Sequence, residues 1–135
     1  MNYRFPVRVY YEDTDAAGIV YYANYFRLME RARTEWLRDL GFEQDVLRRD
    51  FGIVFVVRSA AADYRAPAVF NDLLWVTGEL VEHSRTAMTI GQNVYRQEDD
   101  KLLCKGEVGI VCVDIESFRP SPIPSAILEK IKNAE

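Results

Sequence analysis

The chain has 135 residues, and 49% of them are hydrophobic, which suits one packed domain rather than a disordered tail. Its 17 basic and 21 acidic side chains give a formal net charge of −4 without a long run of one sign, which argues against nucleic acid as a partner. We therefore expect a single domain over residues 1–135.

The N-terminal residues lack the continuous apolar stretch of a signal peptide, and no segment reads as a membrane span. Cys104 and Cys112 lack the close spacing of a metal-binding knuckle, and two cysteines without a secretory signal do not predict a disulfide framework. Because they are eight residues apart, they would face the same side of one strand as buried thiols. These features predict a reduced, cytoplasmic protein.

The N-terminal half predicts a strand, a loop and a helix. Apolar and more polar residues alternate over Tyr3–Glu12, which is typical of a strand, and small and polar residues over 13–18 indicate a loop. From about Asn24 to Leu40 the apolar residues recur at helical spacing, and Gly41 is a natural stop. A short helix is expected over Glu43–Asp50.

The charged residues of the long helix have an ordinary interpretation. Glu30, Arg31, Arg33 and Glu35 are expected to form a solvated face with charge pairs.

The C-terminal part is dominated by β-branched and aromatic residues, which predict strands near Ile53–Arg65, Leu73–Glu82, Thr86–Gln97 and Leu102–Asp114. Residues 97–101 suit a hairpin loop, and a proline-containing connection leads to a short helix near Ser125–Lys132. One long helix followed by long strands predicts an α+β fold, an antiparallel sheet wrapped around a helix. Because one helix cannot cover both faces of such a sheet, we expect an oligomer.

The candidate chemistry lies where the first strand gives way to the helix. Asp13 and Asp15 stand in this loop, and Gly18 permits a close backbone approach. A carboxylate can act as a nucleophile or as a base, and the free N–H groups of a first helical turn can polarise a carbonyl oxygen. The simpler alternative is that an aspartate before a helix is a cap.

The segment Asp13–Tyr25, together with Glu30-Arg31-Ala32-Arg33, resembles the 4-hydroxybenzoyl-CoA thioesterase class of hotdog-fold enzymes. It is especially similar to the Tol-Pal system-associated acyl-CoA thioesterases. The likeness continues through Tyr64–Ala68 and Val111–Asp114 to Arg119-Pro120, so it covers nearly the whole chain.

The resemblance implies a hotdog fold and the hydrolysis of an acyl-CoA thioester to a free acid and coenzyme A. It implies that Asp15 is the catalytic carboxylate, acting by direct attack, which we slightly favour, or as a base that activates water. It also implies that the backbone amide near Tyr22 is the carbonyl donor. The substrate-binding residues that it implies are Gly18, Val20, Tyr21, Arg58, which would line the cleft of a neighbouring subunit, and Arg85, which would approach the coenzyme A phosphates.

One position departs from the pattern. Many Tol-Pal-associated members carry a histidine where this chain has Tyr22. A backbone donor survives that change, because every residue except proline has an amide N–H. An imidazole contribution to proton transfer is lost, since a phenol is a poor base at neutral pH. The substrate preference of the histidine-bearing members is therefore not carried over.

Other sites are disfavoured. His83 is the only histidine and lies at an expected turn, so neither a metal cluster nor a serine triad is readily assembled, and we expect no metal and no cofactor beyond the coenzyme A of the substrate. A glycine-rich phosphate loop and a Gly-x-Ser-x-Gly elbow are absent from the sequence.

The expected assembly is a homotetramer built from hotdog dimers, with acyl carrier protein as a possible further partner. The alternative function is a non-catalytic protein that binds acyl-CoA or acyl carrier protein. A hotdog dehydratase is disfavoured, because His83 is not placed for it. Acyl chain length and the choice between aromatic and aliphatic acyl groups stay open.

Overall fold

The computed structural model describes residues 3–133. Its strands are β1 (Tyr3–Arg8), β2 (Ile53–Tyr64), β3 (Leu73–His83), β4 (Ala87–Arg96) and β5 (Lys101–Asp114). Its longer helices are α1 (Asn24–Asp39) and α3 (Ser125–Asn133), and three short helical segments are η1 (Tyr11–Asp13), α2 (Gln44–Val46) and η2 (Leu47–Phe51). The sequence patterns placed β2 to β5, α1 and α3 to within one residue at each end.

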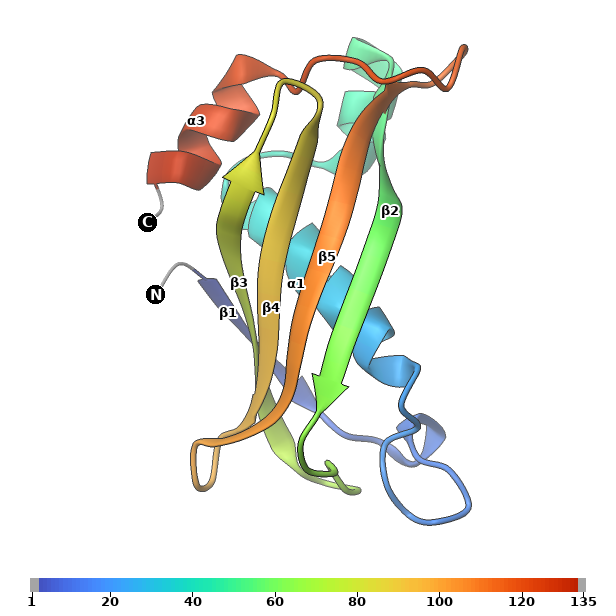
Figure 1. Ribbon diagram of the computed structural model, residues 1–135, viewed down its shortest axis with the longest axis vertical. Coiled ribbons are helices and arrows are strands. Elements are labelled where there is room, and N and C mark those ends of the chain that lie inside the picture. The colour runs from blue at the N-terminus through green and yellow to red at the C-terminus, as the bar shows by residue number, and fades with distance from the viewer. Residues whose placement is uncertain (1–2, 134–135) are drawn as a thin grey trace.

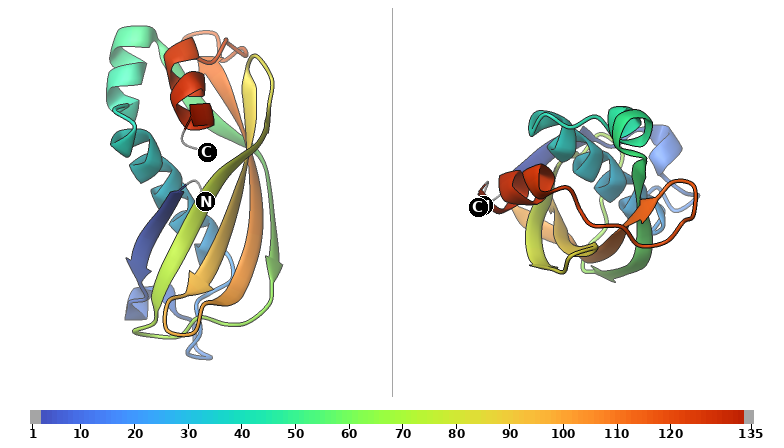
Figure 2. Two further views of the ribbon diagram at one scale, coloured as in Figure 1. Left: turned by 90° about the vertical axis from the view of Figure 1, so that its left-hand side faces the viewer. Right: turned by 90° about the horizontal axis from the view of Figure 1, so that it is seen from above.

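The strands form one antiparallel sheet in the order β1-β3-β4-β5-β2. Helix α1 lies along one face of this sheet, and α3 packs near the end where β3 turns into β4 (Figure 1). Viewed from above, the sheet curves around α1 (Figure 2). An antiparallel sheet wrapped around one long helix is the hotdog arrangement, so the fold class expected from the sequence is confirmed.

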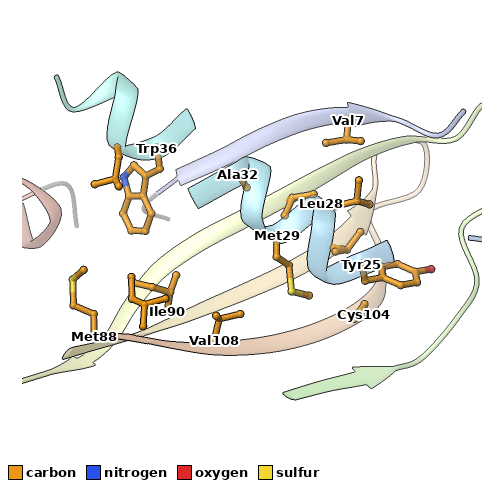
Figure 3. Close-up of a cluster of buried hydrophobic side chains, with 14 of the residues drawn as sticks. Val7, Tyr25, Leu28, Met29, Ala32, Trp36, Met88, Ile90, Cys104 and Val108 are labelled. Atoms are coloured by element: carbon orange, nitrogen blue, oxygen red, sulfur yellow. The ribbon is translucent and has the colours of Figure 1, made fainter. Parts of the chain in front are cut away.

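An apolar stripe on α1 makes the core with the sheet. Five of its residues recur at intervals of one, three or four and are all buried: Tyr25, Leu28, Met29, Ala32 and Trp36. Figure 3 shows this stripe facing side chains of β4 and β5. Since burying one large apolar side chain stabilises a fold by roughly 1.5–3 kcal/mol, this stripe is the main attachment of the helix.

Close packing of α1 on β5 requires a residue without a side chain. A Cβ atom at Gly106 would collide with the Cε atom of Met29 and would lie 2.8 Å from the backbone oxygen of Gln92. Glycine at this position therefore lets the helix approach the sheet.

A polar contact also ties α1 to β4. Gln92 is fully buried, and its Nε2 donates to the carbonyl oxygen of Met29 at 2.9 Å. Its Oε1 accepts from Nη1 of Arg33 at 2.8 Å, and burial lowers the pKa of Arg33. The expectation that Arg33 belongs to a solvated helix face is therefore wrong, because a fully buried side chain of β4 pairs with it.

The N-terminal strand is shorter than the alternation predicts. Strand β1 ends at Arg8, and Tyr11 to Asp13 form a 3-10 turn, in which Asp13 N donates to Tyr10 O at 3.0 Å. Tyr11, which continues the alternation of apolar residues at positions 5, 7 and 9, is 73% exposed and stacks on Phe70. The strand stops here because its neighbour β3 begins at Leu73, opposite Arg8.

The two cysteines are core residues, as predicted. Both thiols are free and buried on β5, on the side facing α1. Burial, with a smaller contribution from the charge of Asp63, raises the pKa of Cys104 to about 11. Burial also raises the pKa of Cys112. Both are thus neutral thiols near pH 7.

Within residues 3–133, none of the helices has the length and apolar character required to cross a membrane.

Candidate active site

The loop before α1 is a small hairpin. Thr14 and Val20 form a bridge, and Asp15 N donates to Ile19 O at 2.9 Å. The turn closes with a hydrogen bond of 2.9 Å from Gly18 N to Asp15 O, and Gly18 has φ of 81°. A positive φ is readily adopted by glycine and disfavoured for residues with a Cβ atom, so Gly18 permits the reversal that presents Asp15.

The carboxylate of Asp15 is exposed and only half engaged. Its Oδ1 accepts from the backbone N–H of Ala17 at 2.9 Å, the bond of an Asx turn, which orients the side chain. No hydrogen bond or ion pair engages Oδ2 among residues 3–133. Asp15 therefore presents one free carboxylate oxygen from an ordered turn.

Asp13, two residues earlier, has a structural role. It is buried, and its Oδ2 accepts from Tyr10 N at 2.9 Å. Its carbonyl oxygen accepts from Tyr21 N at 3.0 Å and from Nδ2 of Asn24 at 2.9 Å. Neither aspartate caps α1, whose N-cap residue Ala23 has no side-chain cap bond. The carboxylate of Asp13 instead caps the 3-10 turn η1, and its backbone carbonyl fastens the loop to the start of α1.

The start of α1 offers free backbone donors. Tyr21 O accepts from Asn24 N at 2.8 Å and closes the first turn. The N–H groups of Tyr22 and Ala23 inside that turn have no acceptor in the part of the chain that the structure describes. Ala23 is the N-cap residue of α1 and Tyr22 precedes it, so these unpaired amides lie at the positive end of the helix dipole and favour a negatively charged oxygen.

A pocket of about 280 Å³ lies beside these donors. It is mainly apolar, and its walls come from the loop, α1, the end of β2 and the segment that follows: Ile19, Val20, Tyr22, Tyr25, Tyr64, Arg65, Ala66 and Pro67. Asp15 and Gly18 belong to the same hairpin but do not line the pocket. The arrangement has the dimensions of a small acyl site with polar atoms at one edge.

Two tyrosines at the site are poor bases. Burial raises the pKa of Tyr25, whose hydroxyl accepts from Ala68 N at 3.1 Å. A hydrogen bond with the Tyr22 side chain raises the pKa of Tyr21, and the negative charge of Asp15 adds to that rise.

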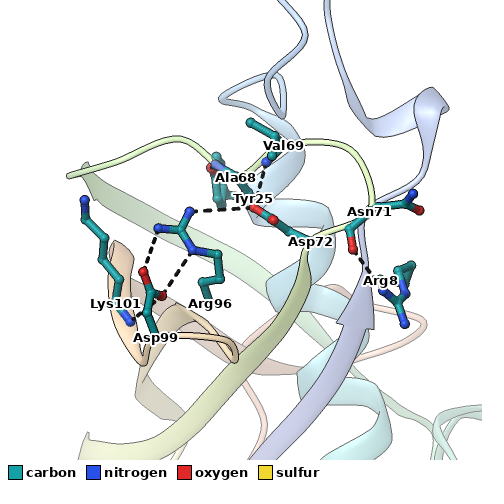
Figure 4. A network of polar contacts seen from close by, with 9 residues as sticks. All are labelled: Arg8, Tyr25, Ala68, Val69, Asn71, Asp72, Arg96, Asp99 and Lys101. Carbon is teal, nitrogen blue, oxygen red and sulfur yellow. Dashed lines mark hydrogen bonds and ion pairs between the residues drawn. The ribbon is translucent and has the colours of Figure 1, made fainter.

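The segment between β2 and β3 holds the other wall of the pocket in place, and Figure 4 shows its anchors. Val69 N donates to Oδ2 of Asp72 at 3.0 Å, and Arg96 lies 3.8 Å from the same carboxylate. Val20 N donates to Ala68 O at 2.9 Å, which joins this segment to the hairpin of Asp15. Loop and pocket wall are thus one hydrogen-bonded unit.

Two of the candidate residues lie away from this site in the chain. Arg58 is exposed near the middle of β2, at a bulge where the pairing with β5 shifts between Val57 and Ser59. Arg85 is exposed in the connection between β3 and β4, at the opposite end of the sheet from the start of α1 (Figure 1). The structure brings together Asp15, Gly18, Val20, Tyr21 and Tyr22, and it does not bring Arg58 or Arg85 to them within one chain.

Two other features of residues 3–133 bear on whether the chain has a second site. Residues 3–133 contain no group of three or more His, Cys, Asp or Glu side chains arranged to hold a metal ion. A larger hollow of about 420 Å³ lies on the face of the sheet away from α1, where Arg4 stacks over Trp75. It lacks first-turn helix amides.

The sequence patterns missed two residues of the site. Nδ2 of Asn24 fastens the loop, and the hydroxyl of Tyr64 donates to the carbonyl oxygen of Tyr22 at 3.0 Å. Asn24 follows a loop and precedes an apolar stripe, which is a signal for a helix-terminal anchor. Tyr64 is 42 residues from its partner, and no local pattern indicates that contact.

Residues 9–131 match the model of the thioesterase-like superfamily. The chain belongs to this family and is an enzyme of the thioester hydrolase class. It is 42% identical over 130 residues to the acyl-CoA thioester hydrolase YbgC of Escherichia coli O6:H1, with 96% of each chain covered.

Two further proteins extend the comparison. The chain is 42% identical over 126 residues to the acyl-CoA thioesterase YbgC of Haemophilus influenzae, covering 93% of this chain and 91% of the relative. The crystal structure of a 1,4-dihydroxy-2-naphthoyl-CoA thioesterase from Synechocystis superposes with a TM-score of 0.90 at 22% identity, over 96% and 95% of the two chains. That similarity supports the fold.

Proposed function

We propose that the chain hydrolyses acyl-CoA thioesters, with Asp15 as the catalytic carboxylate and the Tyr22 amide as the carbonyl donor. One observation supports this assignment most directly. An Asp15 carboxylate oxygen and the Tyr22 N–H, both without a hydrogen-bond partner among the described residues, lie at the same loop–helix junction. The names of the relatives at 42% identity, acyl-CoA thioester hydrolase and acyl-CoA thioesterase, support the choice of substrate.

In the proposed reaction, Tyr22 N–H donates to the thioester carbonyl oxygen and stabilises the charge that develops on it. In one route Oδ2 of Asp15 attacks the carbonyl carbon, the C–S bond breaks, and the coenzyme A thiolate takes a proton from solvent. Water then splits the acyl-aspartyl anhydride. In the other route Asp15 takes a proton from a water molecule that attacks the same carbon, the C–S bond breaks, and the coenzyme A thiolate is protonated by Asp15 or solvent. We favour direct attack, and both routes yield a free acid and coenzyme A.

The substrate's acyl group is proposed to enter the pocket between Val20, Tyr22, Tyr25 and Tyr64. Gly18 and Tyr21 belong to the loop that carries the pocket residues Ile19, Val20 and Tyr22. The reaction needs no metal and no cofactor, since coenzyme A is part of the substrate. The acyl chain length, the preference for aromatic or aliphatic groups, association with the Tol-Pal system and a cytoplasmic location stay predictions.

A homo-oligomer fits the exposed edge of the sheet. Strand β2 is an edge strand of twelve residues, and its unpaired side is a template for another strand. A two-fold pairing of β2 with β2 of a second copy reverses the second chain. The second copy's β3–β4 connection, with its Arg85, then lies at the end where the first copy's α1 begins. Dimers of this kind would supply Arg58 and Arg85 to a shared cleft, and their association into a tetramer is the expected assembly.

The test is Asp15→Asn, which keeps the shape of the side chain and removes its charge. Thiol release from short, medium, long and aromatic acyl-CoA esters should fall by about 10²–10⁴-fold in this variant for every substrate that the wild type accepts. Glu12→Gln is the matched control, because Glu12 is an exposed carboxylate of the preceding turn, and it should keep wild-type turnover.

Full turnover by Asp15→Asn would disprove the role of Asp15. Binding of acyl-CoA by the wild type without thiol release from any ester would favour the alternative, a non-catalytic protein that binds acyl-CoA or acyl carrier protein.

A further inference from the structure

We propose that Tyr64 is a positioning residue of the active site, which holds the peptide group between Tyr22 and Ala23 so that Ala23 N–H acts as a second donor to the thioester oxygen. This inference rests on the proposed function, since it assigns two further residues to the same carbonyl-binding site.

The geometry centres on one peptide plane. The Tyr64 hydroxyl donates to the carbonyl oxygen of Tyr22 at 3.0 Å. That oxygen and the N–H of Ala23 belong to the same planar peptide group, so fixing the oxygen fixes the direction of the N–H. A hydrogen bond to the oxygen also polarises the peptide and strengthens its N–H as a donor.

The N–H of Ala23 is available for this role. It has no acceptor among the described residues, and it adjoins the equally unpaired N–H of Tyr22. Among residues 3–133, only a weak bond, 3.4 Å from Tyr25 N, otherwise restrains the Tyr22 carbonyl. The other bonds of this turn engage Tyr21 and Asn24, so without Tyr64 the peptide group between Tyr22 and Ala23 would be weakly held.

Tyr64 is itself held in place from two sides. Its ring packs edge-on against Tyr22, with centroids 6.0 Å apart, and lies 5.5 Å from the ring of Tyr25. The Tyr25 hydroxyl is bonded to Ala68 N, in the segment that follows Tyr64. Burial raises the pKa of Tyr64, so its hydroxyl keeps the proton that it donates.

A purely structural role fits the position less well. Tyr64 is the last residue of β2 and is 42% exposed. Within the described part of the chain, its hydroxyl makes one hydrogen bond, which is directed at the turn that carries the donors and not at the core.

The test compares Tyr64→Phe, which removes the hydroxyl and keeps the ring, with Tyr11→Phe. Tyr11 is an exposed tyrosine whose ring also stacks and whose hydroxyl makes no hydrogen bond in the described structure. Removing an oxyanion donor outright costs about 10²–10³-fold in kcat, so misdirecting one should lower kcat of Tyr64→Phe about tenfold. KM should stay within about twofold, because the substrate is still bound. Tyr11→Phe should match the wild type.

A spectroscopic measurement separates positioning from folding. In the Asp15→Asn background, the infrared carbonyl band of a bound ¹³C-labelled thioester should shift to lower frequency, and Tyr64→Phe should reduce that shift. An unchanged kcat, or a reduced kcat with an unchanged carbonyl shift, overturns the inference. Wild-type protein that releases no thiol refutes the proposed function and this inference together, whereas full kcat in Tyr64→Phe refutes the inference alone.

Discussion

The position of the Asp15 carboxylate depends on a single residue with a positive φ. Gly18 closes the turn by donating to Asp15 O, and a Cβ atom built at Gly18 would meet no neighbouring atom within 4 Å. Space is therefore not the reason for glycine at this position. The reason is the backbone conformation, with φ of 81°, which is strained for most L-amino acids.

Gly18→Ala should lower the free energy of unfolding by roughly 1–2 kcal/mol, because alanine disfavours a positive φ. Turnover of an acyl-CoA substrate should fall as well, since the turn presents Asp15. Gly18→Asn is the matched control, because asparagine tolerates positive φ better, and it should recover much of both losses. Urea unfolding and thiol release measure the two effects, and equal stability of wild type and Gly18→Ala would contradict the explanation.

At the scale of elements, α1 is attached to the sheet by an apolar stripe and by one buried polar contact. Gln92 of β4 satisfies both of its amide atoms on α1, one through Met29 O and the other through Arg33. Removing the side chain of Gln92 or of Arg33 alone leaves the other without its hydrogen bond in a region of low dielectric constant. An unpaired polar group there destabilises the fold.

Gln92→Leu should therefore lower the free energy of unfolding by about 2–3 kcal/mol, because Arg33 would be left half-buried and unpaired. The double variant with Arg33→Leu should lose less unfolding free energy than the two single variants lose together. The difference, which is the coupling energy, should be roughly 1–2 kcal/mol. Denaturant unfolding of the four proteins of this double-mutant cycle gives the coupling directly. Strict additivity would show that the contact contributes nothing.

At the scale of the whole molecule, β2 is the longer of the two edge strands of the sheet, and its outer side has no partner strand among residues 3–133. Val57 on this edge is 55% exposed, and the neighbouring residues 58–61 are exposed as well. A long apolar edge strand is a pairing surface unless it is covered. The proposed two-fold pairing would cover it.

The native mass in solution should accordingly be at least twice 15.6 kDa, the mass of one chain. Val57→Lys would place like charges near the two-fold axis and should shift the protein toward 15.6 kDa in light scattering. Val81→Lys is the matched control, since Val81 is a 50% exposed valine on the interior strand β3, and it should keep the β2-paired dimer. A wild-type monomer would refute the pairing.

The sequence by itself determined the elements and the class of fold. Hydrophobic periodicity located α1 and four of the strands, because side chains repeat with the period of the element that buries them. It failed at Tyr11, whose apolar ring continues the alternation although β1 has lost its partner strand. The pattern records polarity along the chain and not the length of the neighbouring strand.

For the candidate site too, the sequence indicated some residues and only the structure showed others. Asp15, Gly18 and Tyr22 lie within eight residues, so a motif could indicate them together. Only the tertiary structure distinguished the exposed Asp15 from the buried Asp13, paired Arg33 with Gln92, and brought the Tyr64 hydroxyl to Tyr22. The physical reason is that a hydrogen bond depends on distance and direction in space, and strands and loops bring together residues that no local sequence pattern relates.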